Sequence, residues 1–531
     1  MLQYTRPLDM RYDAKQQSFK ISEPSHKVPI CCMFLCQFDV KKGNVLVWSK
    51  TSPNVPEIPL ENLEFKTIPS GVHEVQKDTI SFVIPKGGKL EEVYYGMSCF
   101  EQNGLSLTEN SEHLDRSELQ MYSLGVIVDA NFRYKGVSKS KFYDWKPNQF
   151  ISATEYIDDI RDLLSHWLRR NVSSSVSNGQ VGSAVRDFEL FETYFDSNCI
   201  KADTATLSSP MLRRSWQHSG TFTGTPSTLS EKQPHMLESL TQWFSFLGPL
   251  FLPLWKASLL RQRILIIVDN GVSFEKCNSL AYCLSILSLI PHSISDRLHQ
   301  DPLQPIYTIG MTDIDLLTQH VSEALSKGKD DYQIPGFVAC TADEILEDRE
   351  ELYDICLKVN NRDSLPEIKM SDGKSIKATP HELELYEKLV VTILGYELSH
   401  DEKEKIAKLV EPTTWSQYFI DGFYWWATAG YMRPSFHESE EESAPDLDRD
   451  NLDVVLSLVG YFHERIASLY DALKEEVETS EDQTVTLSPI FLSANSLDCF
   501  SLRDYEFLET VCRYWFDRPL KVKSIDCRII C

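Results

Sequence analysis

The sequence predicts a mixed protein of the α/β and α+β classes, arranged in three parts. A run of apolar residues from Ile264 to Val268 ends at an Asp-Asn-Gly turn, and a strand without polar alternation is typical of a sheet buried on both faces. Before Arg170, several strand patterns follow one another without a helix between them, which indicates antiparallel pairing. After Pro380, apolar residues recur at helical spacing, so the last part is expected to be mostly helical.

The first part begins after a polar arm, residues 1–27, which shows no periodicity and is predicted to be flexible. Residues 28–170 are predicted to form the first domain. Its first two strands, Val28–Phe38 and Val45–Trp48, flank a turn that contains Gly43 and are expected to form a hairpin. Further strands and a closing amphipathic helix are predicted at Thr79–Ile84, Val93–Phe100, Tyr122–Val128 and, for the helix, Phe150–Arg170.

Residues 171–234 are predicted to be a linker and insert. Asn171–Gly182 and Ala202–Pro234 are rich in Ser, Thr, Gly and Pro, a composition typical of flexible loops. Ser215 follows two arginines and Thr225 precedes a proline, so both match short phosphorylation patterns. Because such patterns are frequent by chance, they support no assignment on their own.

Residues 235–365 are predicted to form a central α/β domain, because strand and helix patterns alternate there. An aromatic run broken by prolines, Trp243–Trp255, leads through the short helical segment Lys256–Arg263 into the buried strand. The elements expected after that strand are a helix at Cys277–Ile290, strands at Tyr307–Ile309 and Gly336–Cys340, and a helix at Thr341–Glu351 with Thr341 and Glu344 as a capping box.

Residues 366–531 are predicted to form a mostly helical C-terminal subdomain. The loop 437–451 interrupts it with seven acidic residues against one arginine, which is the composition of a solvated segment rather than a site. The predicted helices are His381–Leu394, Asp401–Val410, Thr413–Ala429, Leu452–Val477 and Ser501–Phe516, and a closing strand is expected at Lys521–Ile530.

Composition narrows the class of protein. The formal net charge of −25 argues against nucleic-acid binding, which requires a cationic face. The 13 cysteines form no CxxC pair and no regular framework, a usage that favours reduced thiols in the cytoplasm. The first residues lack the apolar core of a secretory signal, and no uninterrupted apolar run reaches the ~18 residues of a membrane span. We therefore expect a cytoplasmic protein.

The common catalytic signatures are missing. The sequence contains no phosphate-binding GxxxxGK[ST] loop, GxGxxG turn, HExxH helix or GxSxG elbow, so no catalytic, cofactor-binding or metal-ligating residue is predicted. Cys31, Cys32 and Cys36 are close together, but they alternate between the two faces of a strand, and buried structural thiols are the preferred interpretation. His463 and Glu464 have no second histidine at i+4, and a helix-surface position is preferred for both.

Two cationic residues beside the central strand allow two interpretations. Arg261 and Arg263 either contact an acidic partner or cap the preceding helix and pair with nearby carboxylates, and the second is the more common role. The C-terminal tail allows two as well. Cys527 and Cys531 lie near basic residues and are candidate palmitoylation sites, or Cys527 is packed in a last strand. Prenylation is excluded because the fourth residue from the end is Arg528.

Several segments together resemble a known family, the LCHN-type DENN proteins, and the length and inserts are similar to its fungal, Avl-nine-related branch. The resemblance covers most of the chain outside the arm, the Ser/Thr-rich insert and the acidic loop, and it is specific as a set. The segments that carry it are CQFDVKKGNVLVW, LEFKTIPSGVHEVQKDTISFV, YYGMSCF, LQMYSLGVIV, LWKASLLRQRILII, GFVACTADEILEDREELYDICL and DYEFLETVCRYWF.

The resemblance implies a tripartite DENN module: a longin-like N-terminal domain, a central DENN domain and a helical C-terminal subdomain. It also implies a Rab-type small GTPase as partner, and guanine-nucleotide exchange without covalent chemistry as the function. A non-catalytic Rab-binding trafficking scaffold is the alternative, and an unrelated enzyme is disfavoured by the missing motifs. Peripheral attachment to a membrane or lipid-droplet surface through an acylated tail stays open. No individual contact residue is transferred, because the resemblance lies in fold-forming positions.

Overall fold

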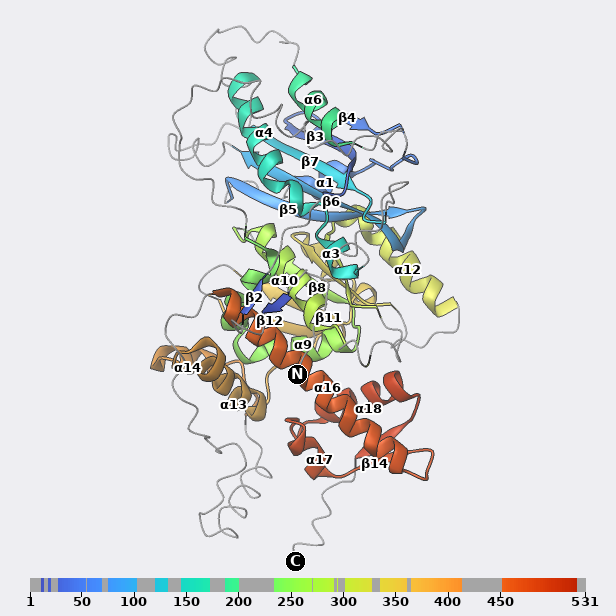
Figure 1. Cartoon of the computed structure of the whole chain (residues 1–531), viewed down its shortest axis with the longest axis vertical. Helices are drawn as coiled ribbons and strands as arrows, with labels where there is room; N and C mark the ends of the chain where they lie inside the picture. The colour runs from blue at the N-terminus through green and yellow to red at the C-terminus, as the bar shows by residue number, and fades with distance from the viewer. Residues whose placement is uncertain are drawn as a thin grey trace, which may run out of the picture.

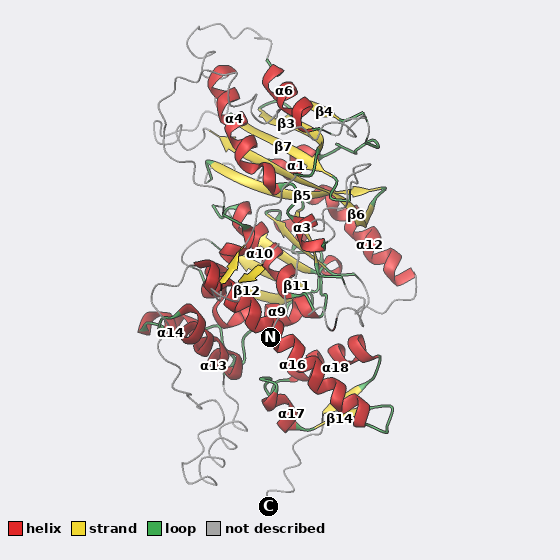
Figure 2. Ribbon diagram, in the orientation of Figure 1, coloured by secondary structure: helices red, strands yellow, loops and turns green. Residues whose placement is uncertain are grey.

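A computed structural model gives the architecture of the chain (Figure 1), and it describes residues 11–13, 18–20, 27–53, 55–68, 75–102, 120–131, 145–171, 187–199, 234–269, 271–290, 294, 301–326, 335–360, 364–412 and 451–522. The mixed α/β class predicted from the sequence is confirmed. Helices cover a long sheet, and a helical part follows it at the end of the chain (Figure 2). No helix among these residues combines the length and the apolar character needed to cross a membrane.

The N-terminal half of the sheet is antiparallel. The predicted hairpin is confirmed as β3 (Ile30–Asp39) and β4 (Gly43–Thr51), and Gly43 has the positive φ of 79° that the turn requires. The other strands are β5 (Lys77–Lys86), β6 (Lys89–Gln102) and β7 (Met121–Val128), in the spatial order β5-β6-β7-β3-β4. A short helix, α1 (Leu63–Thr67), follows β4 in the chain and packs against β4, β3 and β5.

Two helices cover this half of the sheet. α4 (Ile157–Asn171) packs on β6 and β7, and α6 (Glu189–Asn198) packs on β3. The predicted helix Phe150–Arg170 starts too early, because α3 (Lys146–Phe150) and a turn precede α4. In that turn the hydroxyl of Ser152 donates to the carbonyl of Gln149, a local side-chain contact that competes with helical hydrogen bonding.

α6 lies within the linker and insert predicted at residues 171–234, between the two stretches that were predicted as flexible loops. Phe188, Phe191 and Phe195 recur at i, i+3 and i+7, which is a helical signal that composition alone conceals. Phe188 stacks on Trp167 of α4 at 6.0 Å between ring centroids, and Phe191 contacts Trp48 of β4 at 5.6 Å. The phosphorylation patterns at Ser215 and Thr225 lie outside the described residues.

The central half of the sheet is parallel. The buried strand Ile264–Val268 is confirmed as β8, with all five residues buried. It lies between β10 (Phe337–Thr341) and β11 (Ile355–Val359), and β9 (Gln304–Thr308) pairs with the far side of β10. Beyond β11, the antiparallel strands β12 (Glu367–Met370) and β13 (Ser375–Ile376) extend the sheet.

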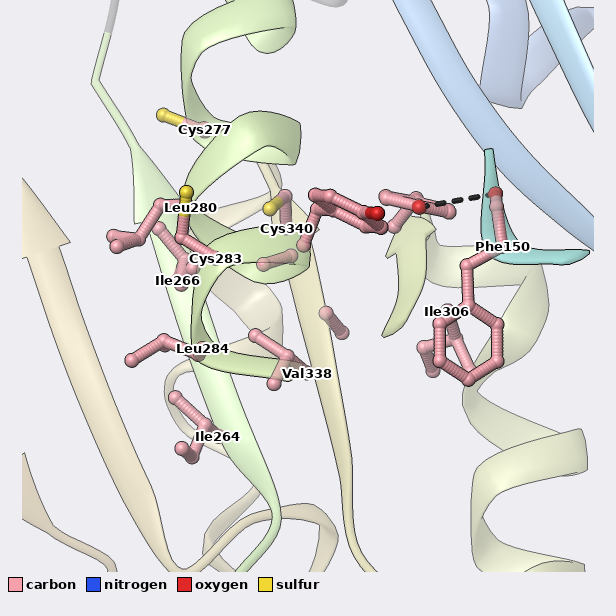
Figure 3. Close-up of a cluster of buried hydrophobic side chains, with 14 of the residues drawn as sticks. Phe150, Ile264, Ile266, Cys277, Leu280, Cys283, Leu284, Ile306, Val338 and Cys340 are labelled. Carbon is pink, nitrogen blue, oxygen red and sulfur yellow. Dashed lines mark hydrogen bonds between the residues drawn. The ribbon is translucent and has the colours of Figure 1, made fainter. Parts of the chain in front are cut away.

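A buried helix, α10 (Phe274–Leu287), covers the parallel strands. Its cysteine and leucine side chains face Ile264 and Ile266 of β8 and Val338 and Cys340 of β10 (Figure 3). The aromatic run from Trp243 is helical, in three pieces that Gly248 and Pro249 divide, and the helical segment predicted at Lys256–Arg263 is helical only up to Leu259. These pieces are α8 (Leu240–Leu247), the 3-10 turn η4 (Gly248–Leu250) and α9 (Phe251–Leu259), and η3 (Met236–Ser239) precedes them.

The two halves form one sheet of 11 strands, in the order β13-β12-β11-β8-β10-β9-β5-β6-β7-β3-β4. They join where Phe82 of β5 pairs with Tyr307 of β9. Tyr307 has a positive φ of 57°, an uncommon conformation for a residue with a side chain, beside a register shift in β10. Its buried hydroxyl donates to the carbonyl of Phe150, the contact drawn as a dashed line in Figure 3.

The predicted helix Thr341–Glu351 is wrong. Thr341 ends β10, and two 3-10 turns follow, η7 (Glu344–Leu346) and η8 (Glu350–Leu352). The capping box does not form because Thr341 still pairs with Ile267 of β8, and its hydroxyl accepts from the backbone N–H of Asp343 rather than from that of Glu344. The carboxylate of Asp343 accepts a hydrogen bond from the backbone N–H of Met311, in the turn after β9. That turn is η5 (Met311–Asp313), and α12 (Ile314–Ser326), which was not predicted, continues it.

The C-terminal part is mostly helical, as predicted. α13 (Pro380–Leu389) continues into the π-helical turn η9 (Val390–Leu394), and α14 (His400–Ala407), α16 (Asn451–Thr479), α17 (Pro489–Ala494) and α18 (Leu502–Phe516) follow. The closing strand is β15 (Leu520–Val522), which pairs in parallel with β14 (Val485–Leu487). The predicted helix Thr413–Ala429 and the acidic loop up to residue 450 lie outside the described residues. The domain boundaries at 27, 170, 234 and 365 stay predictions.

Candidate interaction surface

Three exposed apolar residues lie on segments that meet at the junction of the two sheet halves. Phe65, Met311 and Ile345 are large apolar residues that are 51%, 53% and 54% exposed. We call these three residues the junction surface. Among the described residues, no group of three His, Cys, Asp or Glu side chains is arranged to hold a metal ion.

The junction surface combines both halves of the sheet. Phe65 belongs to α1 of the N-terminal half, whereas Met311 and Ile345 belong to η5 and η7 of the central half. η5 follows β9 and η7 follows β10, and these strands are parallel, so both turns lie at the carboxyl edge of the parallel sheet. That edge is where open α/β sheets usually bind their ligands.

Specific contacts hold the three turns together. Lys66 Nζ of α1 lies 2.7 Å from Asp313 Oδ1 of η5, and both side chains are buried. The backbone N–H of Met311 donates to Asp343 Oδ2 at 3.0 Å, which ties η5 to η7. Gly310, which precedes η5, lies close to both α1 and η7. A Cβ at this position would be 3.4 Å from Asp343 Oδ2 and 3.9 Å from the carbonyl oxygen of Phe65. The three exposed apolar residues therefore belong to one packed unit.

Carboxylates surround the junction surface. In the three segments 60–67, 311–316 and 343–351, the only cations are Lys66, which pairs with Asp313, and Arg349, which pairs with Glu351. A partner with apolar side chains beside cationic ones would match this combination. The exposed carboxylates of these segments are Glu61, Asp315, Glu344, Asp348, Glu350 and Glu351.

A second contact also crosses the junction. Asp78, at the start of β5, accepts hydrogen bonds from the Ser273 hydroxyl at 2.6 Å and from the backbone N–H groups of Phe274 and Glu275. These groups form the N-terminus of α10, where a carboxylate is favoured by the unpaired N–H groups and the helix dipole. Burial raises the pKa of Asp78, while its four hydrogen bonds act in the opposite direction.

Another buried polar cluster joins the central half to the C-terminal helices. Lys256 Nζ of α9 lies 2.7 Å from Glu382 Oε1 of α13 and 2.5 Å from Asp504 Oδ1 of α18. All three side chains are nearly inaccessible to solvent. The cluster is internal, so it holds the fold together and presents no surface to a partner.

Most of the candidate residues named in the sequence are buried in the structure. Cys31, Cys32 and Cys36 are buried, which confirms the interpretation as buried structural thiols, and burial raises the pKa of Cys31 and Cys36 to about 12. The surface position expected for His463 is wrong, because its ring is buried and Nε2 lies 3.0 Å from the carbonyl oxygen of Ile286 in α10. Cys527 lies outside the described residues, as does Cys531.

Both arginines beside β8 are buried, so they do not present a charge to a partner. Arg261 donates to the carbonyl of Ser258 at the end of α9 and to that of Ser288, which confirms the capping interpretation. Arg263 pairs with Asp354, 91 residues later in the chain, rather than with a carboxylate close in sequence.

Sequence reasoning did not find the junction surface. In the sequence, Phe65 is an apolar residue of the segment LEFKT, and Met311 and Ile345 are isolated apolar residues among polar ones. Nothing in their spacing indicates that three segments so far apart in the chain meet. The signal is tertiary, since it arises only when β5 pairs with β9.

A family model and several known proteins are similar to this chain. The family model described as DENN domain-containing protein 11 matches residues 33–368. The chain is 34% identical over 529 residues to a Saccharomyces cerevisiae protein that carries the name "Uncharacterized protein ANR2", and the match covers 95% of each chain.

Vertebrate relatives match a shorter region. The chain is 24% identical over 347 residues to DENN domain-containing protein 11 of Danio rerio, which is 64% of this chain and 56% of the relative. It is 25% identical over 335 residues to the Xenopus laevis protein of the same name, which is 62% of this chain and 60% of the relative. The chain therefore spans less than two thirds of these vertebrate proteins. The region that the family model matches contains all three residues of the junction surface.

Proposed function

Because the chain belongs to the DENN domain-containing protein 11 family, we propose that it is a guanine-nucleotide exchange factor for a Rab-type small GTPase in membrane trafficking. DENN proteins typically promote exchange on Rab GTPases or bind them without exchange. We propose further that the GTPase binds at the junction surface. The observation that supports this site is the exposure of Phe65, Met311 and Ile345 in one unit built from both halves of the sheet.

Exchange of this kind requires no covalent chemistry. An exchange factor binds the nucleotide-free GTPase more tightly than the loaded form, and by linkage its binding weakens nucleotide affinity by the same factor. What the chain must supply is a surface that is complementary to the nucleotide-free form. Apolar side chains provide binding energy, and the surrounding carboxylates select a partner with cationic groups beside its apolar contact.

The test is a panel of purified Rab GTPases loaded with a fluorescent guanine nucleotide. We expect the full-length protein to accelerate nucleotide release from at least one of them. Phe65→Asp and Met311→Asp are each expected to lower kcat/KM at least about tenfold, because a charge in the centre of an apolar contact removes binding energy. Ile490→Asp is the matched control, since Ile490 is 74% exposed on α17, far from α1 in Figure 1.

Two results would change the proposal. Stable binding to a GTP-loaded Rab without accelerated release would favour the alternative function, a non-catalytic Rab-binding scaffold. Loss of exchange in the Ile490 variant together with full activity in the Phe65 and Met311 variants would remove the junction surface as the binding site.

Two finer assignments belong to the same proposal. The 34% identity with a Saccharomyces protein along almost the whole chain supports the fungal, Avl-nine-related branch. We also propose a cytoplasmic protein that associates peripherally with a membrane or lipid-droplet surface, supported by the paired cysteines and basic residues of the tail sequence. Fractionation of cells that express the full chain would test the second assignment.

A further inference from the structure

We propose that Lys66 and Asp313 are positioning residues of the junction surface, because their buried ion pair fixes Phe65 of one sheet half against Met311 of the other. The effect on GTPase binding rests on the proposed function, whereas the ion pair itself is present in the protein without any partner. In this arrangement the binding surface is preformed in the free protein.

The ion pair is buried and connected on both sides. The side chains of Lys66 and Asp313 are 10% and 7% exposed, and their charged atoms are 2.7 Å apart. Lys66 Nζ also donates to the carbonyl of Val83 in β5 at 3.3 Å, and Asp313 Oδ2 accepts from the backbone N–H of Gly310 at 3.0 Å. Each charge is therefore held by its own half of the sheet as well as by its partner.

The ion pair lies next to the exposed apolar residues in the chain, so it can fix their positions. Lys66 directly follows Phe65, and Asp313 is in the same three-residue turn as Met311. α1 has five residues and no side-chain cap at its N-terminus, so it is too short to be stable by itself. The placement of such short turns depends on tertiary contacts, and the ion pair is the charged contact that crosses from one turn to the other.

Other contacts keep the junction folded when this pair is removed. Asp78 at the start of β5 holds the N-terminus of α10, and Phe82 pairs with Tyr307. Asn278 of α10 donates to the carbonyl of Ser81. Removing the ion pair is therefore expected to loosen the exposed end of the junction and to leave the sheet intact.

The test uses the neutral double variant K66M/D313N in the full chain. Methionine keeps the apolar stem of Lys66, and the asparagine oxygen still accepts from Gly310, so no charge is left unpaired in the interior. We expect kcat/KM for nucleotide release from the responsive Rab to fall about tenfold, mainly through a higher KM, with Tm close to that of the control variant. Lys66→Arg keeps the charge and is expected to retain most of the activity.

The matched control is R263M/D354N. Arg263 and Asp354 also form an ion pair, 2.5 Å between charged atoms, between the residues that precede β8 and β11, and the Asp354 side chain is 31% exposed. If the Lys66–Asp313 pair contributed only to stability, the two double variants would have the same exchange activity when their Tm values are equal. We expect the control to keep the exchange activity of the unmodified protein.

A second readout separates this inference from the proposed function. Hydrogen exchange of backbone amides in 63–68 and 310–314 is expected to accelerate in K66M/D313N and to stay unchanged in R263M/D354N. If no Rab responds to the unmodified protein, the proposed function fails while this arm still tests the positioning role. Unchanged amide protection together with unchanged kcat/KM in K66M/D313N would overturn the inference.

Discussion

The carboxylate of Asp78 accepts a hydrogen bond of 2.7 Å from the backbone N–H of Phe274, 196 residues later in the chain. The same carboxylate accepts from the hydroxyl of Ser273, which itself accepts from Glu275 as the N-cap of α10. A side chain of the N-terminal sheet half thus completes the cap of the helix that covers the central half. The two halves are joined by a helix terminus as well as by strand pairing.

Substitution of Asp78 by alanine is expected to destabilise the folded state by about 2–4 kcal/mol, since it removes a helix cap and leaves buried N–H groups unsatisfied. Urea unfolding followed by circular dichroism measures the change. Ser399→Ala is the control, because Ser399 caps the exposed helix α14 away from the junction. An Asp78 variant no less stable than the Ser399 variant would show that the junction does not depend on this cap.

Lys256→Met is expected to lower the free energy of unfolding by about 3–5 kcal/mol, because it leaves the buried carboxylates of Glu382 and Asp504 without their cation. The triple variant K256M/E382Q/D504N is expected to recover most of that loss, since the cluster is then neutral. Thermal unfolding of the three proteins measures the effect. A triple variant as unstable as the single one would mean that packing, rather than charge, dominates the cluster.

Acid is expected to weaken the fold between pH 6.5 and 4 through His235. Burial lowers the pKa of His235 from 6.5 to about 4, and the neutral ring accepts a hydrogen bond from the backbone N–H of Leu237 through Nδ1. The unfolded chain takes up the proton at a higher pH than the folded chain. The stability that neutral His235 contributes is therefore fully present above pH 6.5 and is lost as the pH falls towards 4.

His235→Asn provides the check on that pH dependence. Asparagine keeps an acceptor for the cap but does not titrate, so stability at pH 8 should stay close to that of the unmodified protein. Denaturant unfolding at several pH values should show a smaller decrease from pH 6.5 to 4 than in the unmodified protein. An unchanged decrease would assign the acid sensitivity to other buried groups, of which His381 also has a pKa lowered to about 4 by burial.

Charge reversal beside the junction surface is expected to slow association with the GTPase. Glu344→Lys places a cation among carboxylates that are proposed to attract a cationic partner, so the association rate should fall at low salt and the difference should shrink as salt is added. Stopped-flow binding to the nucleotide-free GTPase measures it. Glu481→Lys, exposed after α16, changes the net charge equally and should have little effect.

The tail prediction concerns Cys527 and Cys531. If they are acylated, the double variant C527S/C531S should lose thioester-linked palmitate and shift from the membrane fraction to the soluble fraction. Acyl exchange after hydroxylamine treatment measures the first effect and fractionation the second. Cys199→Ser, at a half-buried cysteine of the described region, should change neither. Membrane association that persists in the double variant would reject the tail as the anchor.

The sequence alone was sufficient for elements that local patterns specify. The buried strand β8 was predicted with its observed bounds, and the hairpin of β3 and β4 follows from its turn residues and flanking apolar runs. The long helix α16 follows from its apolar stripe. In each case the pattern that defines the element lies within the element itself, so neighbours in the fold are not needed to see it.

Elements whose conformation depends on distant residues were missed. The capping box expected at Thr341 is absent because Thr341 pairs with Ile267 of β8 as the last residue of β10, a partner that no local pattern contains. His463 is buried because α10 presents the carbonyl of Ile286 to its ring. Competition from tertiary hydrogen bonds overrides local preference in both cases.

By itself the sequence determined the class of the fold, its buried strands and its resemblance to the DENN proteins, because apolar periodicity and turn residues are encoded locally. Only the tertiary structure brought together the surface at which we propose that a partner binds. Phe65, Met311 and Ile345 acquire their common surface from the pairing of β5 with β9 and from the ion pair of Lys66 with Asp313. Those contacts join residues more than 200 positions apart in the chain, and proximity across that separation is created by folding rather than by any pattern within a segment.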